Sequence, residues 1–119
     1  LKNLIHNLKS AKQSEYRLAI NSTEGTHFLN TEEIIRCEAD SNYTLFHLFK
    51  RNKMISSKTL KEYEDLLTDH NFIRVHKSHL VNRKFIKALS NDGYVILTDD
   101  SHVEVSRRRY AEVKEILSE

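Results

Sequence analysis

Residues 72–82 carry the sequence FIRVHKSHLVN, in which apolar side chains are interrupted by hydrogen-bond donors. Five apolar residues alternate unevenly with arginine, lysine, histidine, serine and asparagine, and no acidic residue occurs from Asn71 to Asn91. The pattern has neither the 3.6-residue period of an amphipathic helix nor the strict alternation of a half-buried strand. It favours a segment that a few apolar residues hold on a core while several donors point outward.

A second window without acids, from Ser41 to Lys61, shares this basic character. Each window holds five lysine or arginine residues, although the formal net charge of the 119-residue chain is only +2. If the two windows meet in the fold, they form a basic face that suits an anionic partner. The alternative is a solvated surface whose charges are balanced by acids from other segments.

The length suits one domain with a modest core, since 39% of the residues are hydrophobic and 30% are charged. No apolar run approaches the ~20 residues that span a membrane, and the N-terminus lacks the continuous apolar block of a signal peptide. Cys37 is the one cysteine, so no internal disulfide can form, which fits a reducing cytosol. We expect a cytoplasmic protein in which this thiol is buried rather than reactive.

Short segments rich in alternating or β-branched residues predict a mostly β domain of about nine antiparallel strands. Thr31 is expected to cap a single helical turn between two of them. The turn sequence Asp92-Gly93 is the strongest hairpin pattern in the chain. Besides the opening stretch, the predicted strands cover residues 16–20, 26–29, 34–38, 43–49, 54–57, 85–89, 94–97 and 102–105.

Two helices are predicted in the second half of the chain, at about residues 59–68 and 107–117. The first opens with Thr59-Leu-Lys-Glu62, the pattern of a capping box, and Ser106 is expected to cap the second. Leu4, Ile5 and Leu8 lie at helical spacing before the first strand, and we expect residues 1–15 to be a linker from an upstream domain. The apolar faces of the two helices are predicted to comprise Leu60, Tyr63, Leu66 and Leu67, and Tyr110, Val113, Ile116 and Leu117.

Three arginines, Arg107 to Arg109, fill the first turn of the last helix. Cations there oppose the helix dipole, which favours acids at that end by ~0.3–1 kcal/mol each, and a broken local rule often indicates a site. Glu112 is spaced to neutralise Arg108 and Arg109, whereas Arg107 has no acid three or four residues along the helix. We therefore predict that Arg107 is available to an external acceptor, the alternative being a carboxylate distant in sequence.

Two further positions have side chains suited to nucleic acid. Lys77 lies between His76 and Ser78 in the acid-free run, and lysine or arginine at such a place contacts phosphates or guanine edges. Asn42-Tyr43 closes a turn beside the other basic window, where asparagine can pair with adenine and tyrosine can contact phosphate or a thymine methyl group.

The sequence has no pattern typical of catalysis or metal binding. His76 and His79 are three residues apart, but no cysteine and no second pair accompanies them. There is no Gly-x-Ser-x-Gly elbow, and two glycines in all cannot form a phosphate-binding glycine-rich loop. We predict a protein that is not an enzyme and has no metal ion or cofactor.

Three segments, residues 34–44, 72–82 and 103–110, together with the capped helix from Thr59, resemble the LytTR family. The resemblance covers about residues 16–117. It implies three antiparallel β-sheets of about nine to ten short strands with short helices. It also implies the DNA-binding output domain of a bacterial two-component response regulator, linked through its phosphorelay to transcription regulation.

The resemblance further implies loops that enter successive major grooves of double-stranded DNA, with two copies on tandem repeat sites. Residues 16–119 would form the DNA-binding domain, and residues 1–15 the linker from a receiver domain. His76 and Asn82 would fix a loop or contact DNA. Base reading would fall to Asn42, Tyr43, Lys77 and Arg107, and backbone contacts to Lys50, Ser78, His79, Arg83 and Arg108.

Two other functions suit the same residues. The domain could bind RNA or a single strand through exposed aromatic side chains, for which Tyr43 and Phe46 are the candidates. It could instead be a protein-interaction module whose basic face meets an acidic partner.

Overall fold

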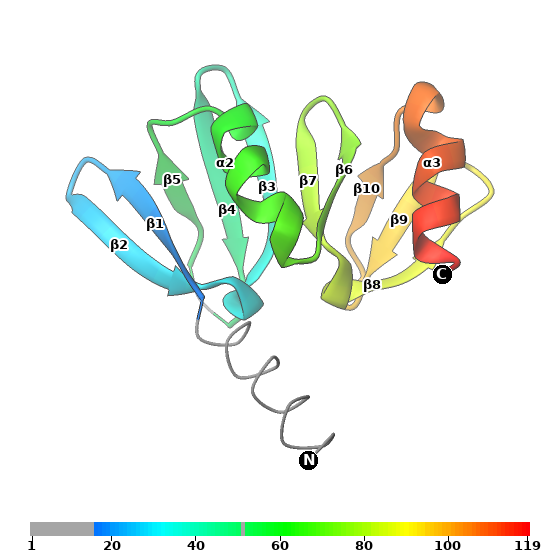
Figure 1. The fold of residues 1–119 in the computed structure, drawn as a ribbon, viewed down its shortest axis with the longest axis horizontal. Coiled ribbons are helices and arrows are strands. Elements are labelled where there is room, and N and C mark those ends of the chain that lie inside the picture. The colour runs from blue at the N-terminus through cyan, green and yellow to red at the C-terminus, as the bar shows by residue number, and fades with distance from the viewer. Residues whose placement is uncertain (1–15, 51) are drawn as a thin grey trace, which may run out of the picture.

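A computed structural model describes residues 16–50 and 52–119, so the expected linker at residues 1–15 lies outside the described residues. The described chain contains ten strands in three antiparallel sheets, two α-helices and three short 3-10 helices, which confirms the mostly β prediction (Figure 1). The strands are β1 (Arg17–Ser22), β2 (Gly25–Asn30), β3 (Ile34–Asp40), β4 (Tyr43–Leu48), β5 (Met54–Ser56), β6 (Phe72–His76), β7 (His79–Asn82), β8 (Ile86–Leu89), β9 (Tyr94–Leu97) and β10 (His102–Glu104). The helices are η1 (Thr31–Glu33), α2 (Leu60–Leu67), η2 (Thr68–His70), η3 (Arg83–Phe85) and α3 (Arg107–Leu117).

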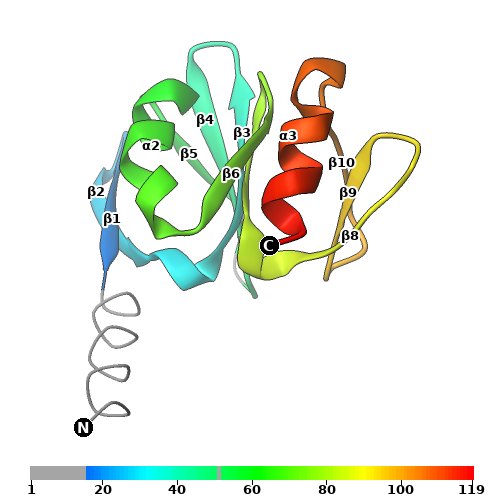
Figure 2. The ribbon, with the colours of Figure 1, turned by 45° about the vertical axis from the view of Figure 1, so that its right-hand side comes forward.

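A five-stranded sheet in the order β5-β4-β3-β7-β6 forms the centre of the domain. The hairpin β1-β2 and helix α2 pack on one of its faces, and the sheet β10-β9-β8 with helix α3 packs on the other (Figures 1 and 2). Each of these two contacts has its own apolar core.

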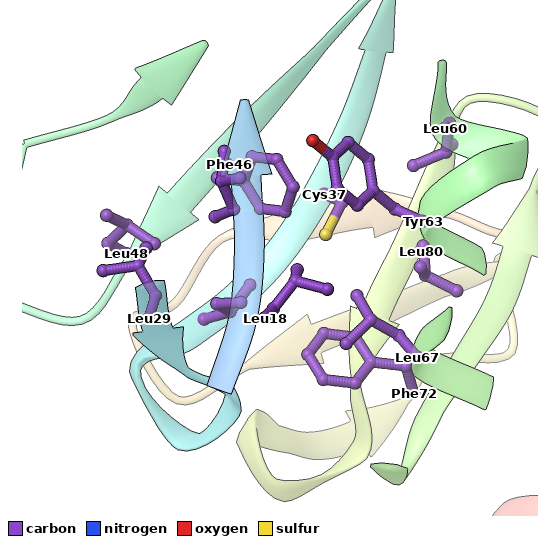
Figure 3. Packing of buried hydrophobic residues seen from close by; sticks show 12 residues of the cluster. Leu18, Leu29, Cys37, Phe46, Leu48, Leu60, Tyr63, Leu67, Phe72 and Leu80 are labelled. Atoms are coloured by element: carbon purple, nitrogen blue, oxygen red, sulfur yellow. The ribbon is translucent and has the colours of Figure 1, made fainter. Parts of the chain in front are cut away.

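The first core lies between the central sheet, α2 and β1-β2 (Figure 3). Tyr63 of α2 is fully buried, meets the ring of Phe46 edge-on at 4.8 Å between centroids, and shares a 2.5 Å hydrogen bond with Ser56. The capping box is present, since the Thr59 amide donates to the Glu62 carboxylate over 3.0 Å. The predicted apolar face is wrong at Leu66, which is 46% exposed.

The second core explains the uneven pattern of residues 72–82. Phe72 and Leu80 face the first core, whereas Ile73, Val75 and Val81 pack in the second, where side chains of β9, β10 and α3 meet them. Both faces of the β6-β7 hairpin are therefore buried along much of its length. A strand buried on both faces has no clean alternation of apolar and polar residues.

Two local predictions need correction, and a third is confirmed. Asn30 rather than Thr31 caps η1, because the Asn30 side chain accepts the Glu32 amide over 2.9 Å. Phe85 belongs to η3, and strand β8 begins after it. The thiol of Cys37 is buried as predicted, and burial raises its pKa well above the ordinary range, although the charge of Arg36 lowers it.

Candidate nucleic-acid interface

Two turns that carry predicted site residues lie side by side at one end of the central sheet (Figure 1). Ser41-Asn42 connects β3 to β4, and Lys77-Ser78 connects β6 to β7. Strands β3 and β7 are antiparallel neighbours, and the Ala39 amide donates a 2.8 Å hydrogen bond to the Ser78 carbonyl. The end of β3 is therefore held against the β6-β7 turn.

The start of helix α3 lies at the same end. The Ser106 amide donates a 2.9 Å hydrogen bond to the carbonyl of Val75, one residue before the end of β6. Ser106 occupies the N-cap position as predicted, although its side chain makes no capping hydrogen bond. The start of α3, whose first residue is Arg107, therefore lies beside the β6-β7 hairpin (Figure 2). We call this end of the molecule, with its loops at residues 41–43, 77–79 and 106–108, the loop face.

The loop face exposes all four predicted base-reading residues: Asn42, Tyr43, Lys77 and Arg107. Tyr43 is 53% exposed. In residues 16–50 and 52–119, the side chains of Lys77 and Arg107 form neither a hydrogen bond nor an ion pair. Both cations are thus free to take an external acceptor.

Three of the predicted backbone-contact residues share this face. Arg108 is exposed, whereas Ser78 and His79 are half-buried. The expectation that Glu112 neutralises Arg108 and Arg109 is wrong, because none of the described ion pairs involves Glu112. All three arginines of the first turn of α3 therefore keep their charge unpaired in the described part of the chain, which strengthens the positive character of the loop face.

The two remaining backbone-contact residues lie elsewhere. Lys50 follows the end of β4, opposite the loop face, and its ammonium lies 5.2 Å from the ring centroid of Phe49. Arg83 follows β7 at that same opposite end and donates to the Ile116 carbonyl over 2.9 Å, so it caps the last turn of α3. The structure does not bring these two residues to Lys77 and Arg107.

Acids balance part of the two basic windows. Four window residues pair with carboxylates outside the two windows, three of them with acids from other segments and Lys61 with an acid of its own helix, so the solvated-surface interpretation holds for them. The unpaired cations at residues 77, 107 and 108 lie on the loop face. The four pairs are Lys61–Asp65 at 3.1 Å, Arg74–Glu64 at 2.5 Å, Lys84–Glu32 at 3.6 Å and Lys87–Asp100 at 2.7 Å.

A polar cluster of Arg36, Glu38 and His47 lies on β3 and β4 next to the loop face, where Glu38 is the cross-strand neighbour of His79. Glu38 accepts hydrogen bonds from Arg36 at 3.2 Å and His47 at 2.9 Å. Burial alone would raise the pKa of Glu38, but these contacts together with nearby charges lower it. Burial lowers the pKa of His47 and of His79, and the opposing effect of Glu38 only partly offsets it. Both imidazoles are therefore held in the neutral form near pH 7.

Two side chains fix the β6-β7 turn: His76, which the sequence marked, and Arg74, which it did not. The Ser78 amide donates to His76 Nδ1 over 3.1 Å, so His76 fixes the loop, one of its two expected roles. Arg74 binds the carbonyls of both His76 and Lys77. Asn82 is buried at the opposite end, where its amide donates to the Ile34 carbonyl over 2.9 Å, so it lies away from the loop face.

The structure contradicts one alternative in part. Phe46 is fully buried in the first core, so it cannot stack on a base, and an aromatic platform of Tyr43 and Phe46 does not exist.

Among the described residues, no group of three or more histidine, cysteine, aspartate or glutamate side chains could hold a metal ion. No helix in the described part is long and apolar enough to cross a membrane.

Fold and loop face together define a β-rich domain that offers unpaired cations and an amide on loops, the chemistry of a nucleic-acid-binding surface. Residues 24–118 match the family described as the LytTr DNA-binding domain. The chain belongs to the LytTR family, and it is a DNA-binding domain of the kind found in transcription regulators. The resemblance carried by residues 34–44, 72–82 and 103–110 is confirmed.

A solved structure supports the fold. It is the LytTr DNA-binding domain of a putative methyl-accepting/DNA response regulator from Bacillus cereus, with a TM-score of 0.74 at 23% sequence identity. The match covers 87% of this chain and 97% of that chain, so the whole domain shares the arrangement of strands and helices.

Curated relatives are longer than this chain. The sensory transduction protein LytT of Bacillus subtilis is 28% identical over 98% of this chain and 49% of its own length. The transcriptional regulatory protein LytR of Staphylococcus aureus is 31% identical over 76% of this chain and 38% of its own length. The heme-containing CO-sensing transcriptional regulator RcoM 1 of Paraburkholderia xenovorans is 30% identical over 75% of this chain and 35% of its own length. The chain spans about half or less of each relative.

Proposed function

We propose that this domain binds a specific sequence of double-stranded DNA and that its loop face enters successive major grooves. One observation carries the proposal: Asn42-Tyr43, Lys77 and Arg107 come from three separate loops, and all are exposed at the same end of one sheet. The major groove is the side of B-DNA on which all four base pairs can be distinguished. Loops on a rigid sheet can present side chains to it without a recognition helix.

Each proposed contact follows from the chemistry of the side chain. Lys77 and Arg107 would donate to guanine, and Asn42 would pair with adenine. Tyr43 would contact a phosphate or a thymine methyl group. Ser78, His79 and Arg108 would hold phosphates, whereas Lys50 and Arg83 lie at the opposite end of the sheet.

The rest of the assembly is also proposed. A second copy would occupy a tandem repeat of the site, and a receiver domain would precede residue 16 in a cytoplasmic response regulator. The length of the relatives supports an additional domain, because this chain spans 49% of LytT and 38% of LytR.

Selection of bound sequences from a random duplex pool tests the proposal. A recurring motif, arranged as two repeats, is the expected result. Competition at fixed salt then compares the selected duplex with its single strands and with RNA of the same sequence. Equal binding of all three, or no enriched motif, would overturn the proposal, and absence of any nucleic-acid binding at low salt would favour a protein-interaction module.

A further inference from the structure

Arg74 lies in an acid-free basic run but does not face an external partner. Its guanidinium uses its three nitrogens on three different acceptors: Nε donates to the His76 carbonyl over 2.8 Å, Nη2 to the Lys77 carbonyl, and Nη1 to Glu64 Oε1 over 2.5 Å. Only 14% of the Arg74 side chain and 22% of the Glu64 side chain is exposed. A planar guanidinium suits this geometry because its donors are fixed relative to one another.

The carbonyls that Arg74 binds belong to the turn that carries Lys77. Other groups of the same turn are also held, since Ser78 donates its amide to His76 Nδ1 and accepts the Ala39 amide at its carbonyl. The peptide groups around Lys77 therefore have little freedom to rotate. An exposed side chain on a fixed backbone loses less conformational entropy on binding than one on a mobile loop.

Glu64 links this turn to helix α2. The helix packs through Leu60, Tyr63 and Leu67 on the first core, on the central sheet rather than on the loop face. Glu64 projects from it to Arg74, so the position of α2 on the sheet helps to set the position of the turn. This contact spans two segments that no local sequence pattern connects.

From these contacts we infer that Arg74 and Glu64 are a positioning pair, which fixes the β6-β7 turn so that Lys77 meets its base in one geometry. The inference rests on the proposed DNA-reading function. The pair contributes to the preference for a specific site, and it contributes little to the general attraction for phosphates, because the charge of Arg74 is already paired with Glu64.

The first test needs no DNA. In the free, folded domain, Arg74→Lys keeps the charge but replaces three spaced nitrogens with one ammonium nitrogen, so it cannot reproduce the three contacts of the guanidinium. We expect the Ser78 amide to exchange with solvent at least roughly tenfold faster than in the wild type, because the turn opens locally. Amides of the Ser41-Asn42 turn should be unchanged. Equal exchange of Ser78 in both proteins would overturn the inference regardless of what the domain binds.

The second test compares the selected duplex with random duplex at fixed salt. Arg74→Lys is expected to weaken binding of the selected duplex roughly tenfold and to leave random duplex nearly unchanged, because one base contact is misplaced. An equal loss on both duplexes, or no loss, would contradict a positioning role. If the wild type itself does not distinguish the two duplexes, the proposed function fails. The exchange experiment on the free domain still tests whether Arg74 fixes the β6-β7 turn.

Two matched acid variants provide a second test of the pair in case Arg74→Lys does not fold. Glu64→Ala and Glu32→Ala each remove one carboxylate that pairs with a cation, so both raise the net charge by one unit. Glu32 lies before β3, at the end of the sheet opposite the loop face. Relative to Glu32→Ala, Glu64→Ala should lower the ratio of selected to random binding. Equal ratios for the two variants would refute the role of Glu64.

Discussion

The Ala39 amide and the Ser78 carbonyl are joined by a 2.8 Å hydrogen bond, which ties the end of β3 to the turn that carries Lys77. Ser106 makes the equivalent link from α3 to β6 through the Val75 carbonyl. These two backbone hydrogen bonds join the three loops of the loop face, and the side chains of Arg74 and His76 fix the β6-β7 turn itself.

Asn82 should be important for stability and unimportant for DNA contact. Its amide donates to the Ile34 and Thr31 carbonyls, and its oxygen accepts the Lys84 amide over 3.0 Å. Asn82→Ala leaves these buried groups unpaired and is expected to cost ~1–3 kcal/mol in the free energy of unfolding. Urea denaturation measures this cost. Asn91→Ala, at an exposed turn, should change it by less than ~0.5 kcal/mol, and equal effects would refute the role of Asn82.

The two aromatic residues of β4 should separate stability from binding. Phe46→Ala removes a buried ring and is expected to cost ~3–5 kcal/mol of stability. Tyr43→Ala removes an exposed ring, so it should barely change stability but should weaken DNA binding. Thermal unfolding and a binding titration on the same samples check both. A folded Phe46→Ala protein with specifically reduced DNA affinity would revive the single-strand model.

Stability is expected to fall as the pH falls from 7.5 to 5.5. Burial lowers the pKa of His47 and His79 in the folded protein, below the ordinary value of ~6.5 that they regain on unfolding. The two histidines therefore bind protons more readily in the unfolded chain than in the folded protein. Their contribution to the free energy of unfolding is complete above the pKa of the unfolded state, and it is lost as the pH falls toward the pKa of the folded state. Urea midpoints at the two pH values measure the change.

The control for that pH dependence is His47→Gln, whose amide can still donate to Glu38 but does not titrate. The variant should show a smaller change in midpoint between pH 7.5 and 5.5 than the wild type. The lowered pKa of Glu38 acts at lower pH, because the unfolded carboxyl titrates near 4.5. An unaltered pH dependence in His47→Gln would contradict the assignment.

Regular features of the fold could be predicted from local sequence, because their causes are local. Strand β9 has β-branched and aromatic residues beside the Asp92-Gly93 turn, and α2 has its capping box at Thr59. The β6-β7 hairpin is harder to predict from the sequence, since burial on both faces removes the alternation that identifies a strand.

Features of the site that depend on tertiary contacts could not be predicted. Arg74 is one of five cations in an acid-free run, and no local pattern indicates that Glu64, ten residues earlier on a helix, neutralises it. Lys50 and Arg83 shared the basic windows with Lys77, but the direction of β4 and β7 carries them to the opposite end of the sheet. Window composition therefore identified the charge of the surface but not which cations lie on the loop face.

The most direct test of the DNA-reading loop face is the affinity of single variants for the selected duplex. Lys77→Ala and Arg107→Ala are each expected to cost ~1–3 kcal/mol at that site, with less effect on random duplex. Lys53→Ala is the matched control, because it also removes an exposed positive charge but lies near the end of β5 that is remote from the loop face.

Fluorescence anisotropy with the selected duplex, alongside circular dichroism of each protein, makes the measurement. We predict folded variants in which Lys77→Ala and Arg107→Ala bind the selected duplex more weakly while Lys53→Ala binds it almost as the wild type does. Unchanged affinity in a folded Arg107→Ala protein, or an equal loss in all three variants, would contradict the account.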